Sequence, residues 1–340
     1  MLSCIAHERV SGIREMQKKA SLKINLIHIC IVILFFLSWE MVLSWYVERN
    51  TFESPFEIDP LLLWKNRPGK FDHNSLGLRG AEIDRSKKPG EVRVIILGDS
   101  SIYGDGVSPE QTAAKHLETI ISTQNPGKLV TVVNGGVCGY SSRQGRYFLS
   151  ELIPAVRPDI VVIGYFHSDV KKERQEDRTV VKQNILTGLR RVLYKSKLYL
   201  ILRKEIGLVK YYLWGRKERR QGSSTACSRV TTSDYSENLR EIIGISREYG
   251  AKTVLIRMQH PANVFPSSPW WQDAEKYIHV QDEVARDTES PVVDIWNLFS
   301  MYSPGEVYTN DLLHPSSYGH YIIAQEIYSC LIENSMLEVR

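Results

Sequence analysis

Apolar residues in this chain form one long run near the N-terminus and a series of short runs farther on. The long run covers residues 24–47. As a helix it is long enough to cross a bilayer core of about 30 Å. Trp39, Trp45 and Tyr46 near its end resemble the aromatic belt of a membrane boundary. The pattern predicts one N-terminal transmembrane helix.

Charges on the two sides of this run predict its orientation. Basic residues precede it at Arg9, Arg14, Lys18, Lys19 and Lys23, whereas little beyond Arg49 follows. The positive-inside rule then places residues 1–23 in the cytoplasm and the rest of the chain outside. No small-x-small cleavage site follows, so we expect a retained, single-pass signal anchor.

Residues 48–90 are punctuated by Pro, Asn and Gly, which predicts an irregular stalk and strap. Beyond them, short Val/Ile/Leu-rich runs alternate with helical patterns. The runs predict strands over residues 92–97, 129–133, 160–164, 253–257 and 292–295. Continuous apolar runs indicate strands that are buried on both faces, and the alternation with helices indicates parallel crossovers. We therefore expect an α/β domain with a five-stranded parallel sheet over residues 91–340.

Polar and glycine residues follow several of the predicted strands. They are Ser100 after the first, Gly135 and Gly136 after the second, His167 to Asp169 after the third, and Asp311 and His314 after the fifth. Ligands of open parallel sheets bind beyond the carboxyl ends of the strands. These residues are therefore expected to meet at one edge of the sheet.

Ser100, Asp311 and His314 are the residue types of a hydrolytic triad. A serine hydroxyl needs a general base within hydrogen-bond reach, and a third group must orient that base. Asp311 lies three residues before His314, so one loop can carry both. Backbone N–H groups at Ser100 and Gly136 are expected to stabilise the oxyanion, because glycine lets the main chain approach a substrate closely. The pattern predicts a serine esterase.

Composition excludes several other classes of protein and of site. The 340 residues carry a net charge of +4, with 43% hydrophobic and 24% charged residues, which indicates a folded protein. Five cysteines without C-x-x-C spacing predict no disulfide framework, and nine histidines without H-E-x-x-H predict no zinc site. No cofactor is expected.

An insertion over residues 171–220 stands apart by its charge. It holds sixteen Lys or Arg and five Asp or Glu, a net charge of +11, so the remaining residues sum to −7. Apolar residues interleave with these charges, which suits a helical segment on an anionic membrane surface. A solvated helical pair that covers the domain is the alternative. Nucleic acid is not expected, because the orientation places this segment outside the cytoplasm.

Four ordered segments resemble the blocks of the SGNH (GDSL-type) hydrolase family. They are G-D-S-S at 98–101, N-G-G-V-C-G-Y-S-S at 134–142, G-Y-F-H-S-D at 164–169 and D-L-L-H-P at 311–315. The resemblance implies a flavodoxin-like three-layer α/β/α domain and ester or O-acyl hydrolysis. It also implies that Ser100 is the nucleophile and first oxyanion donor, Gly136 the second donor, and Asp311 and His314 the rest of the triad. Segments 61–69 and 74–80 are similar to a strap seen in membrane-anchored bacterial members.

One position departs from the family pattern. The family has an asparagine before the aspartate of the third block, as a side-chain oxyanion donor, where this chain has Ser168. Loss of such a donor can cost about 10²–10³ in turnover. Asn134 and His167 are candidates to compensate. With His260 they are the expected lining of the substrate pocket.

Other polar residues near these blocks have structural explanations. Asp99 is expected to bond turn N–H groups, and Ser141 and Ser142 to cap a helix. His320 is expected on the exposed face of the last helix. Asp294, at the end of the fifth strand, is an alternative to Asp311 for orienting His314.

The sequence thus predicts a membrane-anchored, extracytoplasmic serine esterase of bacterial type. Its expected substrates are O-acyl esters, acetyl esters among them, of an envelope glycan or lipid. Two alternatives stay open: an O-acyltransferase with the same triad, and a catalytically weak protein that binds glycan or scaffolds an assembly.

Overall fold

The five predicted strands form one parallel sheet in the computed structural model of this chain. The structure describes residues 25–46, 54–173, 175–180, 192–194, 196–199, 201–202, 206, 227–259 and 273–338. Contacts divide the chain into two units. One contains residues 1–53 and 188–222, and the other, called here the hydrolase unit, contains residues 54–187 and 223–340.

The sheet of the hydrolase unit has the strand order β4-β3-β5-β8-β9. Its strands are β3 (Val92–Gly98), β4 (Val130–Gly136), β5 (Ile160–Gly164), β8 (Lys252–Arg257) and β9 (Val292–Asp294). All neighbours pair in parallel. Numbered along the sheet, this is the 2-1-3-4-5 order of flavodoxin-like folds. The predicted fold is confirmed.

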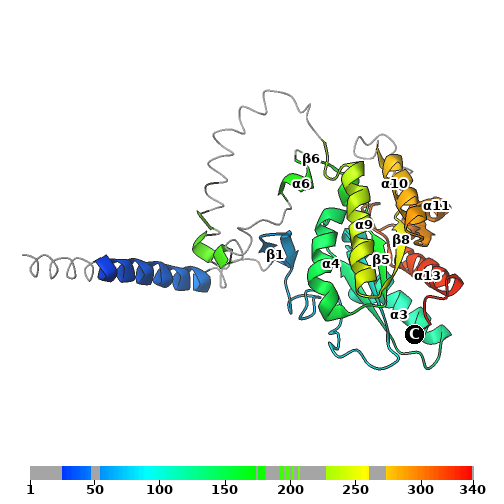
Figure 1. Cartoon of the computed structure of the whole chain (residues 1–340), viewed down its shortest axis with the longest axis horizontal. Coiled ribbons are helices and arrows are strands. Elements are labelled where there is room, and N and C mark those ends of the chain that lie inside the picture. The colour runs from blue at the N-terminus through cyan, green and yellow to red at the C-terminus, as the bar shows by residue number, and fades with distance from the viewer. Residues whose placement is uncertain are drawn as a thin grey trace, which may run out of the picture. The chain divides into compact units, whose positions relative to one another are not determined.

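Helices cover both faces of this sheet (Figure 1). On one face, α3 (Ala113–Gln124) packs against α13 (Ser317–Glu333). On the other, α9 (Thr232–Glu248) packs against both α4 (Ser142–Val156) and α10 (Ala274–Asp287). Short elements occupy the loops: α2 (Ser100–Tyr103), η1 (Pro109–Gln111), α5 (His167–Val170), α6 (Asp177–Val180), α11 (Ile295–Phe299) and α12 (Pro304–Val307).

The segment before the sheet is more ordered than its composition predicted. Residues 54–80, called here the strap, contain an antiparallel hairpin of β1 (Phe56–Asp59) and β2 (Leu63–Asn66). Leu61, Leu62 and Leu78 of the strap are at most 2% exposed and belong to the hydrophobic core. The expectation of irregular structure is therefore wrong for this part, because its apolar residues are buried in the hydrophobic core of the hydrolase unit.

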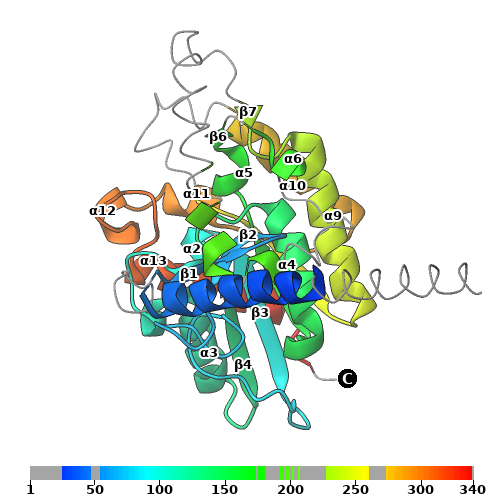
Figure 2. The ribbon, with the colours of Figure 1, turned by 90° about the vertical axis from the view of Figure 1, so that its left-hand side faces the viewer.

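The predicted basic insertion, residues 171–220, lies largely outside the described residues. Its base is a two-stranded ladder of β6 (Lys172–Glu173) and β7 (Cys227–Ser228), which lie side by side in Figure 2. Asp177, just inside the insertion, is buried and paired with Arg229 at 2.9 Å. This pair fixes the root of the insertion to the hydrolase unit.

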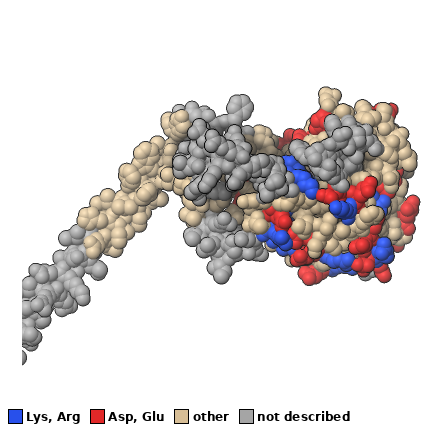
Figure 3. Space-filling model, turned by 90° about the horizontal axis from the view of Figure 1, so that it is seen from above, with Lys and Arg blue, Asp and Glu red and all other residues tan. Residues whose placement is uncertain are grey.

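The long apolar run is a helix over Asn25–Tyr46, with a mean hydropathy of 2.4 in its most apolar window, none of which is buried. Figure 3 draws its visible side in tan, in contrast to the mixed charges on the hydrolase unit. By length and composition this helix can cross a membrane. Within the same unit, the Glu40 carboxylate accepts hydrogen bonds from Ser196 Oγ at 2.7 Å and from the backbone N–H groups of Lys197 and Leu198.

Candidate active site

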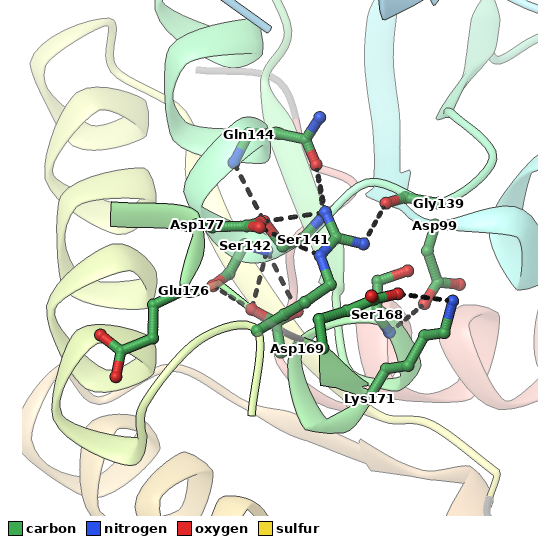
Figure 4. A network of polar contacts seen from close by, with 12 residues as sticks. Asp99, Gly139, Ser141, Ser142, Gln144, Ser168, Asp169, Lys171, Glu176 and Asp177 are labelled. Atoms are coloured by element: carbon green, nitrogen blue, oxygen red, sulfur yellow. Dashed lines mark hydrogen bonds and ion pairs between the residues drawn. The ribbon is translucent and has the colours of Figure 1, made fainter. Parts of the chain in front are cut away.

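Ser100 is the first residue of the one-turn helix α2, directly after β3. The Asp99 carboxylate caps this turn by accepting from the Ser101 N–H at 3.0 Å. Asp99 also accepts from the Ser168 N–H at 3.3 Å, as Figure 4 shows, so its predicted role in the turn is confirmed. Burial alone would raise the pKa of Asp99, but hydrogen bonds from His167 and these N–H groups keep it below its ordinary value.

Three glycines in register, called here the glycine seat, lie under α2 and let it pack closely against the strand ends. Gly98 pairs with Gly136 on one side and with Gly164 on the other. A Cβ on Gly98 would lie 2.4 Å from Ile102 Cγ1, and one on Gly136 would lie 2.2 Å from the Tyr103 backbone nitrogen. Only glycine allows the helix this close to the strand ends.

Ser100, His314 and Asp311 lie in one hydrogen-bonded series. His314 Nε2 is 2.8 Å from Ser100 Oγ, and His314 Nδ1 is 2.5 Å from Asp311 Oδ2. The His314 side chain is 12% exposed, while that of Asp311 is 50% exposed. The arrangement is that of a nucleophile, a base and a group that orients the base.

The loop before α13 explains how Asp311 reaches His314. Leu312 has a φ of +58°, in the left-handed region, which turns the chain between the two residues. Asp311 Oδ1 then accepts from the N–H groups of Leu313 and His314 at 2.9 and 3.0 Å. Desolvation opposes ionisation of this carboxyl, but the His314, Leu313 and Thr309 hydrogen bonds hold its pKa well below the usual range. The carboxylate is therefore charged when it faces the imidazole.

Asp294 does not take this role. Its carboxylate caps α11 through Asn297 N at 3.1 Å and pairs with Arg257 Nη1 at 2.6 Å. His320 also differs from its prediction: it is fully buried, and its Nδ1 accepts from the Ala113 N–H at 3.2 Å. Burial lowers the pKa of His320 to about 3.

Gly136 and Asn134 are hydrogen-bonded to each other. The Gly136 N–H donates to Asn134 Oδ1 at 2.9 Å, and Asn134 Nδ2 donates to the Tyr103 carbonyl at 3.2 Å. This is a correction to the expectation that Gly136 offers a free oxyanion donor. The amide of Asn134, a predicted pocket residue, is bonded to Gly136 and Tyr103. Both residues instead hold the end of β4 against α2.

Ser168 lies at the second position of α5 and is 8% exposed. Its N–H is taken by Asp99, whereas its hydroxyl has no hydrogen-bond partner among the described residues. Of the predicted donors, the Ser100 N–H at the start of α2 and the Ser168 hydroxyl are the two that the structure leaves open.

His167 belongs to a buried network rather than to an open pocket wall. Its Nε2 lies 2.7 Å from the Gln259 carbonyl, and its Nδ1 lies 3.3 Å from Ser101 Oγ and 3.6 Å from Asp99 Oδ2. Gln259 Nε2 in turn donates to Ser101 Oγ at 3.1 Å. His260, the third predicted pocket residue, lies outside the described residues.

A second polar cluster lies beside the site at the start of α4 (Figure 4). Ser141 caps this helix as predicted and donates its hydroxyl to Asp177 at 2.5 Å. Ser142 donates both its hydroxyl and its N–H to Asp169, at 2.5 and 2.9 Å. Burial raises the pKa of Asp169 to about 7 in spite of these bonds. The third-block aspartate thus ties α5 to α4, a role that its position in the block did not reveal.

The strap contacts the loop between β4 and α4. Trp64 Nε1 donates to the Cys138 carbonyl at 2.9 Å, and the Tyr140 hydroxyl donates to the Trp64 carbonyl at 2.6 Å. Gln144 Nε2 donates to the Leu62 carbonyl at 2.6 Å. Burial raises the pKa of the Cys138 thiol to about 12, which makes a thiolate at this loop unfavourable.

Comparisons with known proteins identify one family and several similar solved structures. The model of the GDSL-like Lipase/Acylhydrolase family matches residues 96–322. Similar solved structures include TesA (TM-score 0.47, 18% identity, covering 70% of this chain and 97% of that chain). A lipase/acylhydrolase from Enterococcus faecalis has a TM-score of 0.46 and 20% identity, over 72% of this chain and 96% of that one. A single-residue variant of Axe2, an acetyl xylan esterase from Geobacillus stearothermophilus, has a TM-score of 0.46 and 19% identity, over 73% of this chain and 97% of that one. No curated protein matches the chain.

Proposed function

This chain belongs to the GDSL-like lipase/acylhydrolase family and is a serine ester hydrolase, and we propose that it removes O-acyl groups, acetyl groups among them, from an envelope glycan or lipid. The observation that carries the chemistry is the contact between His314 Nε2 and Ser100 Oγ at 2.8 Å. It sets a base beside a hydroxyl that would otherwise be a weak nucleophile.

In the first step, Ser100 Oγ attacks the ester carbonyl while His314 Nε2 takes the hydroxyl proton. The Asp311 carboxylate keeps the Nδ1 proton directed toward itself and stabilises the imidazolium. The tetrahedral oxyanion is stabilised by the Ser100 N–H and the Ser168 hydroxyl. Collapse of the intermediate breaks the bond to the alcohol oxygen, which leaves with the proton from His314, and acyl-Ser100 remains.

In the second step, water replaces the alcohol. His314 takes one water proton as the water oxygen attacks the acyl carbon, and it returns that proton to Ser100 Oγ when the carboxylic acid leaves. No redox partner is consumed.

Labelling with a fluorophosphonate probe tests this assignment. The wild type is expected to form a covalent adduct, and Ser100→Ala is expected to form none. Ser101→Ala is the matched control, because Ser101 is the adjacent hydroxyl and its Oγ contacts His167 and Gln259 rather than His314. A folded wild type that stays unlabelled would exclude the serine mechanism.

The acyl chain length separates the two substrate classes. Hydrolysis rates on p-nitrophenyl esters from acetate to palmitate are expected to be highest for acetate if a glycan ester is the substrate. A maximum at long chains would instead assign the activity to lipid.

The helix Asn25–Tyr46 anchors the protein in a membrane, with residues 1–23 in the cytoplasm and the hydrolase unit outside. Its mean hydropathy of 2.4 and the basic residues before it support this orientation. Protease added to intact spheroplasts is expected to digest the hydrolase unit. A protected hydrolase unit would reverse the topology.

The basic insertion adds a second membrane contact. Its net charge of +11 supports attraction to anionic lipid headgroups. The bonds from Ser196, Lys197 and Leu198 to Glu40 support a position of this segment beside the anchor helix. Full-length protein in detergent micelles, with several of the insertion's Lys and Arg residues replaced by Gln, should elute from beads that carry anionic lipid headgroups at lower salt than the wild type. Equal salt sensitivity would remove the insertion as a lipid-binding element.

A further inference from the structure

Arg79 is a buried strap residue that lies against the short helix carrying Ser100. Its backbone pairs with Asn134 at the edge of β4, and its side chain is only 6% exposed. The guanidinium lies over the Tyr103 ring, with Cζ 4.4 Å from the ring centroid.

The guanidinium binds carbonyl groups at the end of α2. Its Nη1 donates to the Tyr103 and Gly104 carbonyls at 2.7 and 2.6 Å, and its Nη2 donates to the Val107 carbonyl at 2.7 Å. The last carbonyls of a helix have no partner within the helix. A planar guanidinium can satisfy several acceptors at fixed angles, and the charge strengthens each bond.

Two of these carbonyls, those of Tyr103 and Gly104, lie at the end of the turn that begins at Ser100. The Ser100 carbonyl accepts from the N–H groups of Gly104 and Asp105 at 3.0 and 3.1 Å. A shift of the chain at Gly104 is therefore transmitted to Ser100 through a single turn. At the other end of α2, the Asp99 cap fixes the N–H groups, so Arg79 completes the restraint.

Assuming the proposed role of Ser100 as nucleophile, we propose that Arg79 is a positioning residue of the active site: it holds the carbonyl end of α2 so that Ser100 Oγ stays within reach of His314. The strap is then part of the catalytic scaffold as well as a link in the chain. Lysine cannot replace it, because an ammonium group lacks the planar fork that reaches three carbonyls at once.

The test is the rate constant of Ser100 labelling by a fluorophosphonate probe, measured on the full-length protein in detergent. Arg79→Lys and Arg79→Gln are expected to lower this rate constant and kcat for p-nitrophenyl acetate by about 10- to 100-fold, because a misplacement of about 1 Å can cost about 100-fold. KM should change less than threefold. The melting temperature of each variant is measured beside the rate constant and must lie well above the assay temperature, so that partial unfolding cannot account for slower labelling.

Arg93→Lys is the matched control. Arg93 is also fully buried and bonds the Val156 carbonyl at 2.8 Å and Glu91 at 2.8 Å, but it lies at the opposite end of β3. It should lower the melting temperature without slowing the labelling of Ser100. Asp72→Asn removes only the half-exposed partner of Arg79 at 3.3 Å and should slow labelling by less than Arg79→Lys does.

The outcomes separate this inference from the proposed function. Wild-type labelling that Ser100→Ala abolishes, together with an unchanged rate constant in Arg79→Lys, would overturn the role of Arg79 alone. A wild type that is never labelled would overturn the nucleophile and with it the positioning role. If Arg79→Lys and Arg93→Lys slow the labelling of Ser100 equally, Arg79 acts through the general stability of the protein and does not position Ser100.

Discussion

Replacing Gly136 by alanine tests whether close packing of α2 on the glycine seat controls the activity. The new Cβ would lie 2.2 Å from the Tyr103 nitrogen, 2.6 Å from its Cα and 2.7 Å from the Ile102 carbonyl carbon. Unbonded heavy atoms normally stay about 3.5 Å apart or more. Because all three atoms are backbone, no side chain can rotate away, and α2 must move by about 1 Å.

That displacement sets the expected size of the effect. A shift of about 1 Å in a reacting group can lower the rate by about 100-fold, and overpacking costs about 1–3 kcal/mol of unfolding free energy. We therefore expect Gly136→Ala to lose about 100-fold in kcat/KM on p-nitrophenyl acetate. Urea unfolding, followed by tryptophan fluorescence in detergent, should show the smaller loss of stability.

Gly244→Ala is the control for the substitution itself, because a Cβ there meets no atom within 4 Å and the residue lies inside α9. It should keep full activity and be slightly more stable, since alanine favours a helix. Gly136→Ala retains its N–H, so its loss of activity would come from displacement of α2. Wild-type kcat/KM in Gly136→Ala would refute the argument from close packing.

Three further predictions concern the remaining polar groups. Asp311→Asn should lower kcat by about 10³–10⁴-fold, because the imidazolium loses its partner, whereas Asp294→Asn should keep kcat within threefold; the reverse order in steady-state assays would reassign the group that orients His314. The pKa of His320 falls from 6.5 to about 3 on folding, so the neutral ring is stabilising above pH 6.5, and this contribution declines as the pH falls toward 3. At pH 5 the loss of unfolding free energy from this group is about 2 kcal/mol. Between pH 7 and pH 5, the unfolding free energy of His320→Asn should therefore decrease by less than that of the wild type. Identical decreases in the two proteins would contradict a buried, neutral His320. Ser168→Asn should be at least as active on p-nitrophenyl acetate as the wild type, because an amide adds a fixed donor, and a collapse of kcat would show that the serine has a role of its own.

The fold and the contacts among Ser100, His314 and Asp311 could be predicted because their signals are local. Each strand is built around a short Val-, Ile- or Leu-rich run, and the observed bounds differ from the predicted ones by at most three residues, at the end of β4. Asp311 and His314 are three residues apart, so their contact depends on one loop. Ser100 follows the first predicted strand and this loop follows the fifth. Because ligands of open parallel sheets bind beyond the carboxyl ends of the strands, this order was enough to predict that Ser100 and the loop meet.

Features that depend on contacts between distant segments were missed. Leu61 and Leu78 lie among turn residues, and their burial depends on a surface formed by other elements. The role of Gly136 depends on α2, which approaches it from a different strand. His320 is a different case, since Ile323, Ala324 and Ile327 follow it at helical spacing and would have indicated a buried face.

The restraints on α2 bear on how this site can work with a reduced set of oxyanion donors. Of the predicted groups, the Gly136 N–H is bound by Asn134 and the Ser168 N–H by Asp99. Among the described residues, the predicted donors that stay open are the Ser100 N–H and the Ser168 hydroxyl. Stabilisation of the oxyanion then depends on how well α2 itself is fixed, because its first N–H is the only rigid donor of the predicted set. The glycine seat, the Asp99 cap and the Arg79 guanidinium each restrict that helix, so their loss should reduce both nucleophilic attack and oxyanion binding.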